Sequence, residues 1–214
     1  MADSSANPKA AGPAGQGFWA RSLVAPEERI LRQGHAGCVV WFTGLSGAGK
    51  STVAMTLERR LFDAGRQVCL LDGDNLRHGL CADLGFSPAG RTENIRRAAE
   101  VAGLFVDAGL ICLAAFISPR RADREQARRR LPAGHFIEVY VDAPVAVCRQ
   151  RDPKGLYARA DRGEIPDFTG VSAPYEPPAN PEIVLHTDRE SVDVCAARIL
   201  EYLARGVPAR PRRA

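Results

Sequence analysis

The chain of 214 residues is 45% apolar and 25% charged, with a formal net charge of +4 at pH 7. This composition is typical of one globular domain able to bury a core, and the charge is too small to indicate nucleic-acid binding. No apolar run reaches the roughly 18 residues of a membrane span, and the N-terminal stretch lacks the apolar segment of a secretory signal. Six cysteines are scattered without a C-x-x-C pair, several of them in apolar runs, which predicts buried thiols in a reducing, cytoplasmic compartment.

Both ends of the chain read differently from its middle. Residues 1–33 are expected to form a flexible N-terminal arm, disordered over 1–17 and helical over 26–31, where a proline opens the helix. The helical part is expected to pack on the domain or on a neighbouring subunit. Residues 206–214 form a short basic tail that we expect to be disordered, so the domain itself spans 34–205.

Strands and helices alternate through this domain. Apolar runs predict strands at 38–42, 68–71, 110–117, 136–141 and 183–186. Helical periodicity falls between them, at 53–64, 92–108, 121–131, from 143 onward and at 191–204. The alternation predicts an α/β fold in three α/β/α layers, with a mainly parallel five-stranded sheet. Residues 152–181 have no clear period and are rich in proline and glycine, which predicts a lid loop.

A phosphate-binding motif follows the first predicted strand and precedes a predicted helix. Its G-x-x-x-x-G-K-[ST] pattern, with the residue after it, comprises Gly44, Leu45, Ser46, Gly47, Ala48, Gly49, Lys50, Ser51 and Thr52. In that context the backbone N–H groups are expected to surround the phosphates of a nucleoside triphosphate. Lys50 is expected to reach the β- and γ-phosphates, and the Ser51 hydroxyl to bind Mg²⁺.

Two classes of nucleotide-binding enzyme are excluded because the sequence lacks features that they require. None of the three lysines follows an asparagine, so the guanine-reading N-K-x-D motif of GTPases is missing. A hexameric ATPase needs a longer chain. A small-molecule kinase remains.

Polar residues after the second strand indicate where the second substrate, the acceptor of the phosphoryl group, would bind. Asp72 and Asp74 flank one glycine at a strand end, where they would orient Mg²⁺ or accept a proton from an attacking hydroxyl. The alternative is a plain turn with Asp74 as a helix N-cap. Further along, Asn94 and Arg97 share a helix face preceded by Arg91, a cluster that suits an anionic substrate.

Two aromatic residues in predicted loops add to this cluster. Phe86 and Phe168 would stack a base between them, although each alone is more often a local core residue.

A set of motifs distributed over about 34–203 resembles adenylyl-sulfate kinases. These motifs are GLSGAGKST (44–52), DGDNLRHGL (72–80), LGFSPAGRTENIRR (84–97), FISP (116–119), RDPKGLY (151–157), FTG (168–170) and PYEPP (174–178). The resemblance implies transfer of the γ-phosphoryl group of ATP to the 3′-hydroxyl of adenosine 5′-phosphosulfate (APS), with Mg²⁺. It places the APS contacts on Asp74, Asn75, Arg77, Phe86, Arg91, Asn94, Ile117, Ser118, Lys154 and Phe168. Ser118 also matches a serine described in some members as a phosphoserine intermediate.

The sequence departs from the family pattern at three positions. Gly90 replaces an acidic residue, Arg120 an aromatic residue or histidine, and Asp167 a glycine or asparagine. None of the three is assigned to chemistry, but Asp167 adjoins Phe168 and would weaken substrate binding.

The expected reaction is direct in-line transfer. Lys50, with Lys154 or a lid arginine, would neutralise charge while Asp72 orients or deprotonates the acceptor hydroxyl, without a Ser118 phosphoenzyme. The resemblance also implies a homodimer and allows non-covalent coupling to an ATP sulfurylase. Two rival functions stay open: a kinase of another small polar acceptor, and a non-catalytic binding module that keeps the fold.

Overall fold

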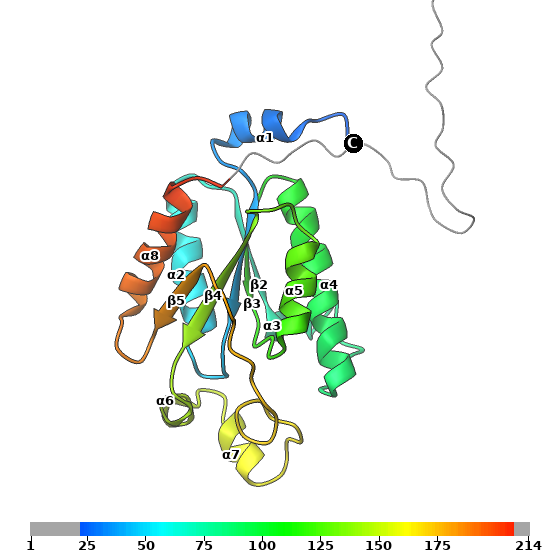
Figure 1. Cartoon of the computed structure of the whole chain (residues 1–214), viewed down its shortest axis with the longest axis vertical. Helices are drawn as coiled ribbons and strands as arrows, with labels where there is room; N and C mark the ends of the chain where they lie inside the picture. The colour runs from blue at the N-terminus through cyan, green and yellow to red at the C-terminus, as the bar shows by residue number, and fades with distance from the viewer. Residues whose placement is uncertain (1–21, 208–214) are drawn as a thin grey trace, which may run out of the picture.

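A parallel sheet forms the centre of the computed structural model, which describes residues 22–207 (Figure 1). Its strands are β1 (Cys38–Thr43), β2 (Val68–Asp72), β3 (Ile111–Ala115), β4 (Phe136–Asp142) and β5 (Ile183–His186). Their spatial order is β2-β3-β1-β4-β5, and every neighbouring pair is parallel. The predicted five-stranded sheet is confirmed. β1 lies in its middle and is buried along its whole length, as its unbroken apolar run predicts.

Helices cover both faces of the sheet. α2 (Lys50–Asp63) and α8 (Val192–Ala204) pack on one face, and α4 (Pro88–Asp107) and α5 (Arg121–Arg129) on the other. Each face has its own apolar core, so the three-layer α/β/α prediction is also confirmed. Local signals fix the helix starts: the Ser87 side chain accepts a hydrogen bond from the Gly90 N–H, and Ser191 accepts one from Val194.

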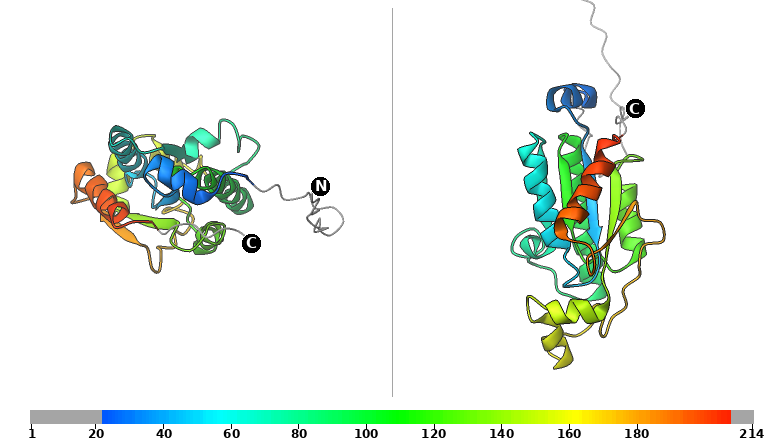
Figure 2. Two further views of the ribbon diagram at one scale, coloured as in Figure 1. Left: turned by 90° about the horizontal axis from the view of Figure 1, so that it is seen from above. Right: turned by 90° about the vertical axis from the view of Figure 1, so that its left-hand side faces the viewer.

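Shorter helices lie beyond the ends of the strands. α3 (Gly73–Leu76), α6 (Val145–Arg151) and α7 (Leu156–Asp161) follow the carboxyl ends, whereas α1 (Pro26–Gln33) lies across the opposite end (Figures 1 and 2). The Gln33 amide donates to the Ala108 carbonyl at 3.3 Å, and Arg66 donates to the Gly34 carbonyl at 2.5 Å. This helical part of the predicted arm therefore packs on the domain. Residues 1–21 of the arm and 208–214 of the tail lie outside the described residues.

The predicted lid contains more structure than its sequence suggests. α7 forms within it, and the side chains of Tyr157 and Phe168 are 2% and 6% exposed and join the core on the α2 face. Their rings meet edge to face at 5.0 Å. The expectation of a segment without regular structure is therefore wrong over α7.

Candidate active site

The phosphate loop, residues 44–49, turns from β1 into α2 at the carboxyl end of the sheet. Two of its glycines are required by close backbone packing. A Cβ on Gly44 would lie 2.4 Å from the Val141 carbonyl oxygen, and one on Gly47 would lie 2.7 Å from that of Cys148. Both have positive φ, at 152° and 75°. The loop is thereby held against β4 and α6 in a fixed shape.

Lys50 is the buried cation of this loop. Its ammonium donates to the carbonyl oxygens of Gly44 at 3.0 Å and Leu45 at 2.7 Å. Burial lowers the pKa of Lys50 to about 8. Its charged form is therefore costly here, and a phosphate bound in the loop would stabilise it.

Ser51 and Asp72 join the phosphate loop to the acceptor side. The Ser51 hydroxyl donates to Asp72 Oδ2 at 2.7 Å, and Asp72 Oδ1 accepts from the Asp74 N–H at 2.9 Å. Asp72 is thus the N-cap of α3, so the alternative that placed this cap on Asp74 is wrong. A hydroxyl and a carboxylate side by side are hard oxygen donors that fit Mg²⁺, which takes few protein ligands and completes its shell with phosphates and water. Among the described residues, no group of three or more His, Cys, Asp or Glu side chains offers a denser metal site.

α3 and the lid meet through charge. Lys154, just before α7, forms an ion pair with Asp74. Asn75 follows on the exposed side of α3. Lys154 of the lid is therefore in direct contact with Asp74, one of the residues that the resemblance assigns to APS.

Two arginines organise the loop before α4. Arg77 donates to the Leu84 carbonyl at 3.2 Å, and its guanidinium lies 4.2 Å from the centre of the Phe86 ring, which is 59% exposed. Arg91 donates to the Phe86 carbonyl at 2.8 Å and reaches across to the Thr169 hydroxyl at 2.6 Å. Arg91 therefore connects the start of α4 to the lid.

We call three further residues that the resemblance assigns to APS the acceptor wall: Asn94 and Ser118 are buried, and Ile117 is half-buried. Asn94 is 4% exposed, and its Oδ1 has no hydrogen-bond partner among residues 22–207. The Ser118 hydroxyl accepts from Trp41 Nε1 at 3.1 Å and donates to Thr43 Oγ1 at 3.0 Å. A buried amide oxygen without a partner is costly, so it marks a place where a ligand donor would bind.

Some predicted residues are not brought together as expected. Arg97 is engaged by Asp83 at 2.6 Å and Glu93 at 2.9 Å, which neutralises it, so it is not a free cation for an anionic acceptor. Phe168 lies in the core against Tyr157, whereas Phe86 lies at the surface under Arg77.

Several residues at the site were not singled out from the sequence. Arg151 donates to the Thr187 carbonyl at 2.6 Å, the Thr187 hydroxyl donates to the Ala48 carbonyl at 2.7 Å, and the Tyr157 hydroxyl donates to the Ser46 carbonyl at 3.0 Å. These contacts support the phosphate loop from the lid and from β5. One signal could have found Thr187: it follows directly after a strand, at the sheet edge where ligands bind.

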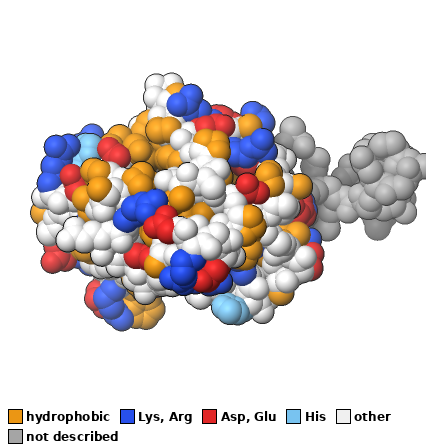
Figure 3. Space-filling view, turned by 90° about the horizontal axis from the view of Figure 1, so that it is seen from below, with side chains coloured by type: hydrophobic (Ala, Val, Ile, Leu, Met, Phe, Trp, Pro, Cys, Tyr) orange, Lys and Arg blue, Asp and Glu red, His pale blue; other side chains and the backbone are white. Residues whose placement is uncertain are grey.

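The outer surface at this end of the molecule carries charges of both signs. Figure 3 shows it from below, with basic and acidic side chains next to one another instead of gathered into one patch. Much of this surface charge is paired, as in Arg149–Asp161 at 2.6 Å and Arg162–Glu164 at 2.5 Å.

Comparisons with known proteins agree on one family. The family model for adenylylsulphate kinase matches residues 36–186. The adenylyl-sulfate kinase of Acaryochloris marina is 55% identical over 185 residues, covering 86% of this chain and 90% of its own. That of Shewanella amazonensis is 53% identical over 188 residues, covering 88% of this chain and 95% of its own.

Solved structures give the same result. The APS kinase of Mycobacterium tuberculosis in complex with AMPPNP and APS superposes with a TM-score of 0.76 at 51% identity, covering 79% of this chain and 99% of that one. A hexameric APS kinase from Thiobacillus denitrificans superposes with a TM-score of 0.62 at 35% identity; it covers 82% of this chain but 31% of its own. With this agreement over most of its length, the chain belongs to the adenylyl-sulfate kinase family of P-loop kinases.

Proposed function

We propose that this chain transfers the γ-phosphoryl group of ATP to the 3′-hydroxyl of APS, giving 3′-phosphoadenylyl sulfate and ADP. The observation that carries the proposal is the 2.7 Å hydrogen bond between Ser51 and Asp72. It joins a complete phosphate loop to a group of acceptor-side residues at the same edge of the sheet. The M. tuberculosis relative, at 51% identity, was solved with AMPPNP and APS together, which supports the same pair of substrates here.

The chemistry is mainly positioning and charge stabilisation. Lys50 approaches the β- and γ-phosphates from within the loop, and Ser51 with Asp72 would hold Mg²⁺. When bound, the metal neutralises charge on the phosphate oxygens. Asp72 already accepts two hydrogen bonds, and its carboxylate has capacity for further ones. Asp72 therefore orients the 3′-hydroxyl and accepts its proton as the bond to phosphorus forms.

Transfer proceeds directly, without a phosphorylated serine. The Ser118 hydroxyl is 2% exposed and bonded to Trp41 and Thr43, neither of which is a base. A serine nucleophile needs an adjacent base to remove its proton. Ser118 serves instead as part of the buried wall that holds APS.

Recognition of APS rests on Asn94 of that wall together with Arg91, Lys154 and Phe86. The free Oδ1 of Asn94 accepts a hydrogen bond from the acceptor nucleotide. Arg91 and Lys154 supply positive charge toward its phosphosulfate. Because Arg77 covers one face of Phe86, the adenine base stacks on the other face.

The remaining expectations concern assembly and location. A homodimer is the assembly expected from the family, and non-covalent coupling to an ATP sulfurylase stays a prediction. All six cysteines are free thiols in the structure, and five of them are buried, which suits a reducing compartment such as the cytoplasm. No helix within residues 22–207 is long and apolar enough to cross a bilayer.

The acceptor assay tests this function. ADP release from Mg·ATP should be at least about a hundredfold faster with APS than with adenosine, AMP, shikimate or gluconate, because the site holds a charged nucleotide in place. Lys50→Ala should lower the rate with APS by at least about tenfold while the protein stays folded. Equal rates with a sugar acid would favour a kinase of another acceptor, and no release with any acceptor would favour a binding module.

A further inference from the structure

The C-terminal part of the lid carries a motif with no assigned role. Residues 174–178, here called the strap, match the PYEPP motif and lie between the rest of the lid and β5. Tyr175 is hydrogen-bonded to the Thr43 hydroxyl at 2.9 Å, and the Glu176 N–H donates to the Pro119 carbonyl at 2.8 Å. The strap is thus attached to the carboxyl end of β1 and to the loop after β3.

Arg124 on α5 lies at the centre of these attachments. Three different nitrogens of its guanidinium each reach a different element. Nε donates to Glu138 on β4 at 2.7 Å, one Nη to the Ser118 carbonyl at 2.6 Å, and the other Nη to the Glu176 carbonyl in the strap at 2.8 Å. The side chain is 2% exposed. Its planar arrangement of donors matches all three acceptors at once.

The Ser118 backbone needs such support. Ser118 has a φ of +39°, in the left-handed region that is unfavourable for a residue with a side chain. A conformation of this kind persists only where its surroundings determine it. Arg124 holds the Ser118 carbonyl while Trp41 holds its hydroxyl, and Thr43 holds the neighbouring Ile117 carbonyl at 2.8 Å.

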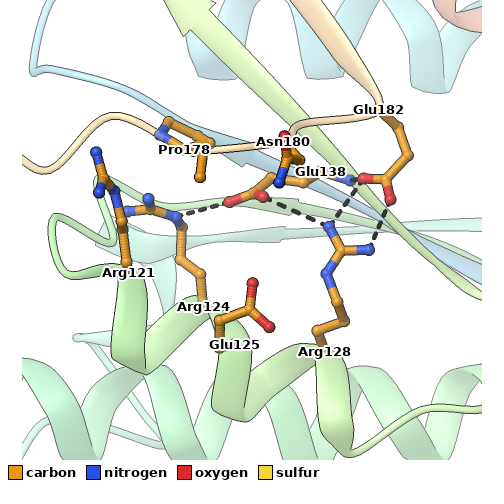
Figure 4. Close-up of a pocket in the computed structure, with 9 residues that line it drawn as sticks. Arg121, Arg124, Glu125, Arg128, Glu138, Pro178, Asn180 and Glu182 are labelled. Atoms are coloured by element: carbon orange, nitrogen blue, oxygen red, sulfur yellow. Dashed lines mark hydrogen bonds and ion pairs between the residues drawn. The ribbon is translucent and has the colours of Figure 1, made fainter.

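Arg124 belongs to a network of ion pairs in which each charged side chain has a partner of opposite charge. Glu138 also contacts Arg128 at 3.4 Å, and Arg128 pairs with Glu182 at 2.6 Å (Figure 4). They border a cleft of about 380 Å³ between α5 and the chain after the strap. Two cations thus face two anions, which leaves no net charge in the network for a separate ligand. A buried ion pair contributes little net stability, so its specific geometry is the feature to explain.

We propose that Arg124 is a positioning residue for the acceptor site. It fixes the Ile117–Ser118 wall, which faces APS, to the strap and so to the C-terminal end of the lid. This inference rests on the proposed function for the identity of the acceptor, but the connection between wall and lid does not depend on it. Arg124 itself touches no substrate in this account.

Arg124→Lys is the test variant, and Arg128→Lys is its matched control. Lysine keeps the charge beside Glu138, but its three donors sit on one atom and cannot reproduce the positions of Nε and the two Nη atoms, which reach three acceptors on different elements. Arg128 belongs to the same helix and the same ion-pair network, yet within the described part of the chain its hydrogen bonds go to Phe136, Glu138 and Glu182 and none reaches Ser118 or the strap. Because the Arg124 side chain is 2% exposed and that of Arg128 is 28%, the size of the effect alone does not identify the role. A merely structural role of Arg124 would change the KM values for APS and ATP equally.

Steady-state kinetics with both substrates gives the first readout. Arg124→Lys should raise the KM for APS by about tenfold, as expected for the loss of hydrogen bonds to a charged donor, with the KM for ATP changed less than about twofold. Arg128→Lys should leave both KM values within about twofold. Equal changes in the two KM values, or the same change in both variants, would overturn the proposal.

Amide exchange gives a readout that needs no catalysis. Residues 152–173 should exchange at least about threefold faster in Arg124→Lys than in Arg128→Lys, because the lid has lost one attachment. If Arg124→Lys does not fold, the double variant Arg124→Met with Glu138→Met removes the buried charges together and should show the same APS-specific KM change; an unchanged KM would overturn the proposal. A wild-type chain inactive with APS would instead refute the proposed function, leaving the exchange comparison to judge Arg124.

Discussion

Lys50 connects proton binding to ATP binding. Its pKa is lowered by burial from 10.5 to about 8, so between these values the folded chain has lost a proton that the unfolded chain still holds. Stability of the ATP-free protein therefore rises with pH across that window, because the cost of the buried charge disappears. Phosphate binding has the opposite dependence, since it requires the charged form.

The dissociation constant of ATP measures this dependence. It should be flat below about pH 8 and rise by up to about tenfold per pH unit above it, because only the protonated fraction of Lys50 binds phosphate as a cation. Calorimetric titration across the alkaline range gives the values. Lys50→Arg, whose guanidinium stays charged, should bind ATP with no such rise. A rise of the same size in Lys50→Arg would assign the titration to another group.

Single residues also show what the sequence could not reveal. Gly90 and Asp167 depart from the family pattern, and only backbone geometry explains how they fit. A Cβ on Gly90 would lie 2.7 Å from the Gly85 carbonyl oxygen, so glycine suits this turn. Asp167 has a φ of +53°, a conformation that asparagine and glycine adopt readily and aspartate tolerates, and its carbonyl accepts from Arg91 at 2.5 Å. Arg120 is exposed at the N-cap of α5, two residues after Ser118.

The strands and helices with strong hydrophobic periodicity could be predicted from the sequence, whereas the short helices could not. The five strands and the long helices could be predicted because each follows one continuous apolar pattern. α3 and α7, with 4 and 6 residues, are too short to show a helical period. α7 is stabilised by tertiary contacts, above all the packing of its Tyr157 into the core on the α2 face, which no local pattern encodes.

The lid is the element whose stability should respond most to ligands. Its polar links, Lys154 to Asp74 and Arg91 to Thr169, use residues assigned to APS, so closure and substrate binding share the same groups. We expect ADP with APS together to slow amide exchange over 152–173 by at least about tenfold, and more than either nucleotide alone. Proteolysis after Lys154 and Arg159 should slow in parallel.

The contacts of Tyr157 and Phe168 with the core reduce how much further ligands can slow amide exchange in the lid. They hold the lid without ligands more firmly than its irregular composition suggests. Full protection of residues 152–173 in the ligand-free chain would mean that the segment is a fixed insertion, with Lys154 and Phe168 as preformed contacts.

For the whole molecule, the parallel sheet explains why a site dispersed along the chain is compact in space. The phosphate loop, Asp72 and Ser118 follow three neighbouring strands, β1, β2 and β3, and parallel strands place their carboxyl ends at one edge. The motifs predicted this gathering, and the family match over 36–186 agrees with it. The network of Thr43, Arg124 and the strap was not predicted, because it depends on contacts between elements up to 132 residues apart.

The most direct test of 3′-phosphorylation of APS by this chain is the position of the new phosphate on the product. The purified chain is incubated with Mg·ATP and APS, and the product is mapped by mass spectrometry and phosphorus NMR, beside a reaction with 3′-deoxy-APS. We expect one added phosphoryl group, on the 3′-oxygen, with one molecule of ADP formed for each molecule of product. We expect no transfer to the 3′-deoxy analogue. Phosphate on another position, or transfer to the 3′-deoxy analogue at a comparable rate, would contradict this expectation.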